Sequence, residues 1–198
     1  MVRELGQRFE IMFTNIKKWS VGSSIQAPLD SLLELIRTEG VKAADVDKIV
    51  VRVGERGAKI ANNRAMSAIN MQHLLAIMLH DGGLSFAAAH DVGRMKDPAV
   101  VAIRKRIELV PSPELNDVRP RRQGIVEITM RNGRTLTHRT YAVKGTADNP
   151  MNRTDVEEKT MDLLEPVIGT RRARDLIKEV WNLERVKDMR KLRPLLKA

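Results

Sequence analysis

The chain has 198 residues, of which 42% are apolar and 30% charged, so it can bury a core and is not expected to be disordered. It contains no cysteine, which excludes disulfides, thiolate metal sites and a cysteine nucleophile. Its formal net charge of +10 raises the question of nucleic-acid binding.

The first predicted helix follows an extended segment and a turn. Residues 9–19 mix apolar and basic side chains, and a turn rich in serine and glycine covers 20–24. Pro28 suits the first turn of a helix, and Gly40 is expected to end it. Between these two residues, an apolar stripe with helical spacing is formed by Leu29, Leu32, Leu33 and Ile36.

The next segments predict a strand and then more helices. The β-branched run KIVVRV at 48–53 is typical of a strand, and we interpret the glycine-containing stretch at 54–57 as its end. Asp97-Pro98 is a typical helix start. After residue 57 we expect three helices, over 68–80, 86–93 and 97–106, and then a strand over 107–110.

A β-hairpin is the least ambiguous local signal. Residues 124–130 and 135–143 are strand-like and are joined through Asn132-Gly133, the pair preferred in two-residue type I′ turns. With that loop, Glu127 would lie directly opposite His138. The side chains expected to face the core are those of Val126, Ile128 and Met130.

The last third is predicted to be helical. Residues 154–157 (TDVE) are typical of a capping box, and Asp188 is expected to cap a final short helix. The element order predicts an α+β fold, with a small sheet that includes a β-hairpin, helices packed on it, and further helices at the C-terminus. We expect an α+β domain over 1–150. A helical segment over 151–198 is expected to pack on it or on a missing helical domain.

The position of the charges argues against nucleic-acid binding. Residues 171–198 carry ten basic and four acidic side chains, which is most of the excess. Two Trp, one Tyr and three Phe offer few surfaces for base stacking. A basic face of this kind is solvated or docks on an acidic partner. No apolar run approaches the roughly 18 residues that a membrane span needs, so we expect no membrane contact and a cytoplasmic location.

Common catalytic and metal-binding patterns are absent from the sequence. Neither a phosphate-binding glycine pattern nor a Gly-x-Ser-x-Gly elbow occurs. His73 and His80 lie two turns apart on one predicted helix, whereas helical metal ligands are normally four residues apart. We therefore expect no metal site.

One loop has the composition of a carboxylate receptor. Lys17 and Lys18 precede a hydroxyl-rich turn and the start of a helix. Free N–H groups at a helix start, with lysine and serine donors beside them, suit a carboxylate ligand. An exposed loop without a ligand is the alternative interpretation.

Several short motifs follow one another along nearly the whole chain. They are Lys17-Lys18-Trp19 before Leu29-Asp30-Ser31, Asn63-Arg64 before the helix ending at Asp81-Gly82, Asp97-Pro98, Asn132-Gly133, Lys144-Gly145, Asn149-Pro150 and Leu183-Glu184. In this order they resemble the C-terminal domain of the MmgE/PrpD family, which includes 2-methylcitrate dehydratase and cis-aconitate decarboxylase.

The resemblance implies the lid domain of a cofactor-independent lyase, of dehydratase type. It would act on a polycarboxylate such as 2-methylcitrate in propionate metabolism. Family members are longer and begin with a helical domain that carries acid–base groups. The chain is therefore expected to be a fragment or one half of a split enzyme and to be inactive alone. The complete enzyme would be a homo-oligomer.

The same resemblance implies roles for individual residues. Lys17 matches the family's lid lysine, a catalytic or substrate-binding charge. His73 falls where relatives often have a tyrosine, so it is expected either to carry a proton or to be a half-buried structural residue. The residues expected to bind substrate are Ser23, Ser24, Gln26 and Arg64. Gly22 stands where the family commonly has a histidine or a cysteine, and Gln26 stands where it has a histidine, which argues against the decarboxylase reaction.

Two other functions stay open. The first is a non-catalytic binding module that docks an acidic partner through its basic C-terminal helices. The second is a nucleic-acid accessory protein, against which the charge distribution argues.

Overall fold

A computed structural model describes residue 4 and residues 6–197 of the chain. The chain divides into two compact units, Met1–Pro150 and Met151–Ala198. None of the described helices is both long enough and apolar enough to cross a membrane.

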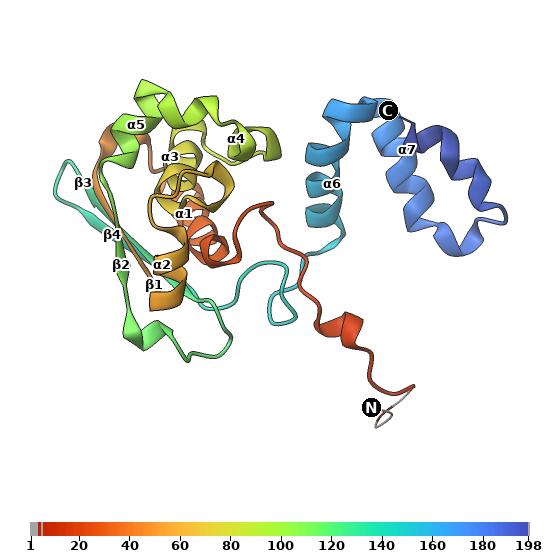
Figure 1. Cartoon of the computed structure of the whole chain (residues 1–198), viewed down its shortest axis with the longest axis horizontal. Helices are drawn as coiled ribbons and strands as arrows, with labels where there is room; N and C mark the ends of the chain where they lie inside the picture. The colour runs from red at the N-terminus through yellow and green to blue at the C-terminus, as the bar shows by residue number, and fades with distance from the viewer. Residues whose placement is uncertain (1–3, 5, 198) are drawn as a thin grey trace. The chain divides into compact units, whose positions relative to one another are not determined.

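The first unit contains a four-stranded mixed sheet, and its helices lie on one side of that sheet in Figure 1. The strands, in the order in which they pair, are β2 (Ile107–Pro111), β1 (Val46–Val53), β3 (Gly124–Met130) and β4 (Thr135–Thr140). Strand β1 runs parallel to β2 and antiparallel to β3, which pairs antiparallel with β4. This mixed sheet with its hairpin and helices confirms the predicted α+β class.

The core of this unit lies between the sheet and two long helices, α1 (Gln26–Glu39) and α3 (Met71–Asp81). Burial alternates along β1, because successive side chains of a strand point to opposite faces and only one face is covered. Helix side chains with no exposed surface include Leu29, Leu32, Leu74, Leu75 and Met78. Burying one such side chain contributes about 1.5–3 kcal/mol.

Two helix ends follow their sequence signals. Gly40 adopts φ 65° after α1, and its N–H bonds the carbonyl of Ile36. The carboxylate of Asp97 accepts the N–H of Ala99 at 2.9 Å and caps α5 (Pro98–Arg104). Short 3-10 turns complete the unit at Glu10–Phe13, Ser23–Ile25, Ala43–Asp45, Ser67–Ile69, Gly93–Lys96 and Pro113–Leu115, together with α4 (Phe86–His90).

One helix was not predicted. Gly54 ends β1 as expected, but it also precedes α2 (Glu55–Ala61). Gly57 lies inside this helix, and a glycine there lowers helix propensity and hides the pattern. A helix of seven residues is also too short to show a clear apolar stripe.

The hairpin has a different loop from the predicted one. Met130 and Arg134 are joined by a backbone hydrogen bond of 2.8 Å, so the loop contains three residues. Gly133 adopts φ 85°, whereas Asn132 does not have a positive φ, so the turn is not type I′. Glu127 therefore pairs with Thr137 and not with His138. The face assignment is correct: Val126 and Ile128 are fully buried, and Met130 packs against the core from its edge.

The second unit consists of helices with a small core. They are α6 (Arg153–Ile168), α7 (Thr170–Trp181) and the 3-10 segments Leu183–Arg185 and Met189–Leu196. The capping box of α6 is formed by Asn152 and Asp155, which exchange two hydrogen bonds of 2.8 Å, two residues earlier than predicted. Asp188 caps the last segment as expected. The buried residues of this unit's core are Ile168, Ala173 and Leu176.

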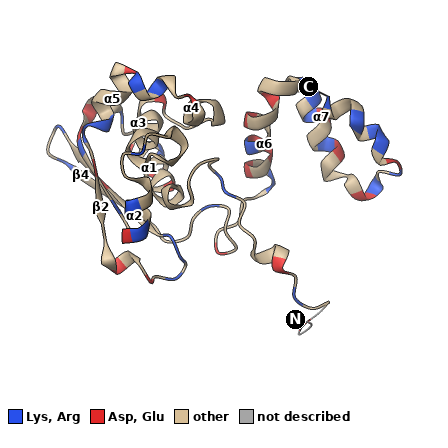
Figure 2. Ribbon diagram, viewed as in Figure 1, with Lys and Arg blue, Asp and Glu red and all other residues tan. Residues whose placement is uncertain are grey.

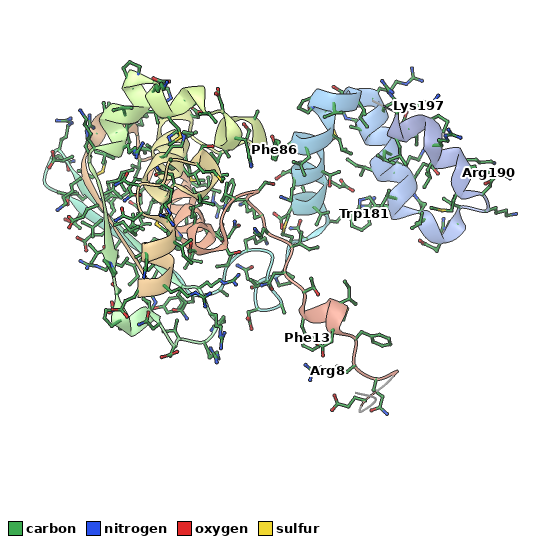
Figure 3. The ribbon with its side chains drawn as sticks, in the orientation of Figure 1. Arg8, Phe13, Phe86, Trp181, Arg190 and Lys197 are labelled. Carbon is green, nitrogen blue, oxygen red and sulfur yellow. The ribbon has the colours of Figure 1, made fainter. Side chains whose placement is uncertain are left out.

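Basic side chains cover much of the second unit. Figure 2 shows Lys and Arg along α7 and along the segment that follows it. The guanidinium of Arg153 lies 4.8 Å from the centre of the Trp181 ring, and Figure 3 labels Trp181. Trp181 is 38% exposed, so part of this cation–π pair remains in contact with water.

Candidate functional site

A cavity of about 520 Å³ opens beside the start of α1. Its lining comes from three segments that are far apart in the sequence and can be followed by colour in Figure 1: 15–26, 119–122 and 143–148. The volume lies in the usual range of small-molecule sites. The lining residues are Asn15, Lys17, Ser23, Gln26, Arg119, Pro120, Arg121, Arg122, Val143, Lys144, Gly145, Thr146 and Asp148.

The cavity is strongly basic. Five of its lining residues are Lys or Arg, and Asp148 is the only acidic one. Among the described residues, no carboxylate forms an ion pair with Arg119, Arg121 or Arg122. Clustered cations repel one another, and an anion placed among them removes that repulsion and gains charge-assisted hydrogen bonds. The arrangement suits a ligand with several negative charges.

Asp30 holds two sides of the cavity together. It lies on α1, where Oδ1 accepts the indole N–H of Trp19 and Oδ2 accepts the backbone N–H of Lys144, both at 2.9 Å. Burial raises the pKa of Asp30, while the hydrogen bonds from Lys144 and Trp19 oppose that rise. The same two loops also meet directly, because the N–H of Ile16 donates to the carbonyl of Gly145 at 2.8 Å.

Lys17 and Gln26 make different contacts in this loop. The ammonium of Lys17 donates to the carbonyl of Val21 at 3.1 Å, which leaves two of its three donors for a ligand. The amide of Gln26 is buried and donates to the carbonyl of Trp19 at 2.9 Å, and it accepts the N–H of Trp19 at 3.2 Å. Gln26 therefore fixes the shape of the turn, and only part of its surface reaches the cavity.

The arginine-rich loop was missed by sequence reasoning. Gln123 fixes it, because its Oε1 accepts two hydrogen bonds from Arg139, at 2.7 and 3.0 Å, while its Nε2 donates to the carbonyl of Pro120. Arg122 adopts φ 66°, a left-handed conformation that is costly for a residue with a side chain. The available signal was the run RPRR at 119–122, which resembles any solvated basic loop.

The structure brings three of the predicted site residues together. Lys17, Ser23 and Gln26 line the basic cavity. Ser24 lines a neighbouring cavity of about 450 Å³. Arg64 is exposed, lines neither cavity, and donates through Nε to the carbonyl of Ile60 at 2.9 Å.

His73 lies in the core. It is fully buried on α3 rather than half-buried, and neither ring nitrogen has a hydrogen-bond partner among the described residues. Burial, followed by the nearby charges of Arg104 and Arg94, lowers its pKa from 6.5 to about 4, and Asp91 opposes this. The imidazole is therefore neutral at pH 7. His73 lines neither cavity. Its catalytic role stays a prediction.

Comparison with known proteins identifies the family of the chain. Residues 19–185 match the model of the MmgE/PrpD C-terminal domain. The chain belongs to this family. A cis-aconitate decarboxylase from Homo sapiens is 27% identical over 129 residues, which are 65% of this chain and 27% of that relative. The chain thus spans about a quarter of the length of the curated relative that it matches.

The basic cavity lies almost entirely within the MmgE/PrpD match. Its arginine-rich loop and the segment 143–148 fall inside residues 19–185, while Asn15 and Lys17 lie just before them. Within the described part of the chain, no group of three or more His, Asp or Glu side chains could hold a metal ion.

Proposed function

We propose that the chain is the polycarboxylate-binding lid of an MmgE/PrpD lyase of dehydratase type, with 2-methylcitrate or a similar tricarboxylate as substrate. The observation that carries this proposal is the cavity lined by five Lys and Arg residues and one Asp. Family membership and the decarboxylase named among its relatives support lyase chemistry on a polycarboxylate. Within lyase chemistry, the assignment of a dehydratase reaction is part of our proposal.

The cations would act on the charge that develops during the reaction. Removal of a proton next to a carboxylate places negative charge on the substrate, and fixed cations lower the energy of that state. In this proposal Lys17 holds one carboxylate with its two remaining donors. Arg121 and Arg122 hold a second carboxylate through their planar guanidinium groups.

The proton-transfer groups would come from elsewhere. Among the residues that the structure describes, Asp148 is the only acidic one that lines the cavity, and no histidine lines it. We therefore propose that a helical domain or a partner chain supplies the general base and acid, within a homo-oligomeric enzyme. This chain would bind, orient and polarise the substrate.

Binding of propane-1,2,3-tricarboxylate, an unreactive tricarboxylate, tests the proposal on this chain. Isothermal titration should give saturable binding that Lys17→Met weakens by at least about tenfold, because a charge-assisted hydrogen bond contributes about 1.5–3 kcal/mol. Lys18→Met is the matched control. The Lys18 ammonium lies 4.7 Å from the centre of the Trp19 ring, and Lys18 does not line the cavity, so this change should weaken binding less than threefold. Equal effects of the two substitutions would refute the role of Lys17.

A second candidate function is a non-catalytic module that docks an acidic protein. The observation that favours it is the basic second unit, with ten basic and four acidic side chains in 171–198. Poly-L-glutamate is a suitable probe. Binding that is lost when Arg171, Arg172 and Arg174 are all changed to Gln, and kept in Lys17→Met, would favour docking over substrate recognition.

A further inference from the structure

A second cavity of about 450 Å³ lies beside α2. Its apolar lining residues are Val53, Ile60, Ala61, Ile69 and Leu115, whereas those of the basic cavity are Pro120 and Val143. Val53 and Ala61 belong to the packed core, and Leu115 is also buried, so these side chains form a fixed apolar wall. Apolar walls with a few polar groups are typical of sites that bind organic ligands.

The walls of this cavity are held in place by direct contacts. The side chain of Asn116 accepts the N–H of Glu55 at 2.9 Å and donates to the Glu55 carboxylate at 2.8 Å, which ties the 115–117 loop to α2. A Cβ at Gly57 would lie only 3.1 Å from Cβ of Ser24, so α2 also packs tightly on the turn before α1. The cavity is therefore formed before any ligand arrives.

The second cavity is also cationic. Its charged lining residues, in the described part of the chain, are Arg56, Arg121, Arg122 and Asp117. None of these three arginines forms an ion pair with a described residue. An unpaired guanidinium beside an apolar wall complements a molecule with one anionic end and one apolar end.

We propose that the second cavity binds an alkyl carboxylate. Its chain would lie against Ile60, Ile69 and Leu115, and its carboxylate would meet Arg121 and Arg122. A polycarboxylate fits this cavity poorly, because charges placed against the apolar wall would lose water without gaining a partner. A neutral apolar molecule would leave the arginines unused. The site does not depend on the proposed lyase chemistry.

Octanoate and butyrate, titrated into the full 198-residue chain, are the probes. Octanoate should bind at least about tenfold more tightly than butyrate, because each buried methylene group favours binding. Equal affinity for the two acids would overturn the proposal, since the apolar wall would then not be in use.

Ile60→Glu places a negative charge on the wall and should weaken octanoate binding by at least about tenfold. Ile60 is 44% exposed, so the variant should fold, and circular dichroism checks this. Ile60→Met keeps an apolar side chain and should change octanoate affinity less than threefold. Unchanged octanoate binding in a folded Ile60→Glu variant would overturn the assignment.

Two further measurements separate this site from the basic cavity. Lys17 does not line the second cavity, so Lys17→Met should leave octanoate binding unchanged. Ile60→Glu should weaken the binding of propane-1,2,3-tricarboxylate much less than it weakens the binding of octanoate. If Lys17→Met abolished octanoate binding, octanoate would be occupying the basic cavity and this proposal would fail, whereas the proposed lyase function would stand.

Discussion

His73 shows how burial decides the chemistry of a side chain. The sequence places it on an amphipathic helix, where it could be a proton carrier or a packed residue, and the structure encloses it completely. Its pKa is lowered to about 4 because the charged imidazolium would lose its water and face Arg104 and Arg94. The folded chain therefore favours neutral His73, while the unfolded chain takes up a proton near pH 6.5.

The stability of the chain should fall as pH falls from about 6.5 to 4 because of His73. In this window the unfolded state binds the proton and the folded state does not, so protonation favours unfolding. A decrease in pKa from 6.5 to about 4 corresponds to roughly 3 kcal/mol. Urea unfolding at a series of pH values should show His73→Leu losing less stability than the wild type between pH 7 and pH 4.

Met78, a fully buried side chain on the same helix that does not titrate, provides the control for that measurement. Met78→Leu should follow the wild-type pH dependence. If His73→Leu also followed it, the imidazole would be protonated equally in the folded and unfolded states.

At the scale of elements, Asp30 joins two loops to α1 without lining the cavity. We predict that Asp30→Ala costs about 2 kcal/mol of stability, since it leaves two donors without a partner. It should also weaken binding of propane-1,2,3-tricarboxylate, because the loops of Lys17 and Lys144 lose a common anchor. Urea unfolding and isothermal titration measure the two effects.

Ser31 is the matched control on the next residue of the same helix. Its buried hydroxyl is hydrogen-bonded to that of Thr140 at 2.7 Å, and neither residue lines the basic cavity. Ser31→Ala should therefore reduce stability and leave binding unchanged. If Asp30→Ala behaved in the same way, Asp30 would only stabilise the fold.

The hairpin loop gives a second prediction at this scale. Gly133 adopts φ 85° with no atom near a would-be Cβ, so Gly133→Ala should cost about 1 kcal/mol through backbone strain alone. Gly83 has equally open surroundings but no positive φ, so Gly83→Ala should be neutral or slightly stabilising. Thermal unfolding of the two variants compares them. An equal effect would mean that the left-handed turn does not constrain position 133.

Local sequence signals predicted the helices and strands themselves more accurately than the contacts between them. The signals for α1 and α5 are each contained within one helix, so the sequence alone was enough to place both helices. These signals are the apolar stripe from Leu29 to Ile36, the helix end at Gly40 and the helix cap at Asp97. The hairpin residues were identified, but the register shifted by one because Asn132-Gly133 fits both a two-residue and a three-residue loop. The RPRR loop could not be assigned to a site, because its meeting with Lys17 depends on how distant segments pack.

At the scale of the whole molecule, the described lining of the basic cavity combines five Lys and Arg side chains with one carboxylate. We predict that the purified chain binds propane-1,2,3-tricarboxylate and does not dehydrate 2-methylcitrate. The reason is that Asp148 is the only carboxylate that lines the basic cavity. Chromatographic detection of the alkene product checks this, with a complete family dehydratase as the positive control. Turnover by this chain alone would mean that Asp148 or an unassigned group transfers the proton.

Arg121 and Arg122 line both cavities, so the two sites draw on one positive potential. An anion held by these guanidinium groups in either cavity lowers the attraction that the other cavity can offer. Thermodynamic linkage makes such an effect reciprocal: each ligand raises the dissociation constant of the other by the same factor. A loop of four residues would thus make an alkyl carboxylate and a polycarboxylate mutual antagonists.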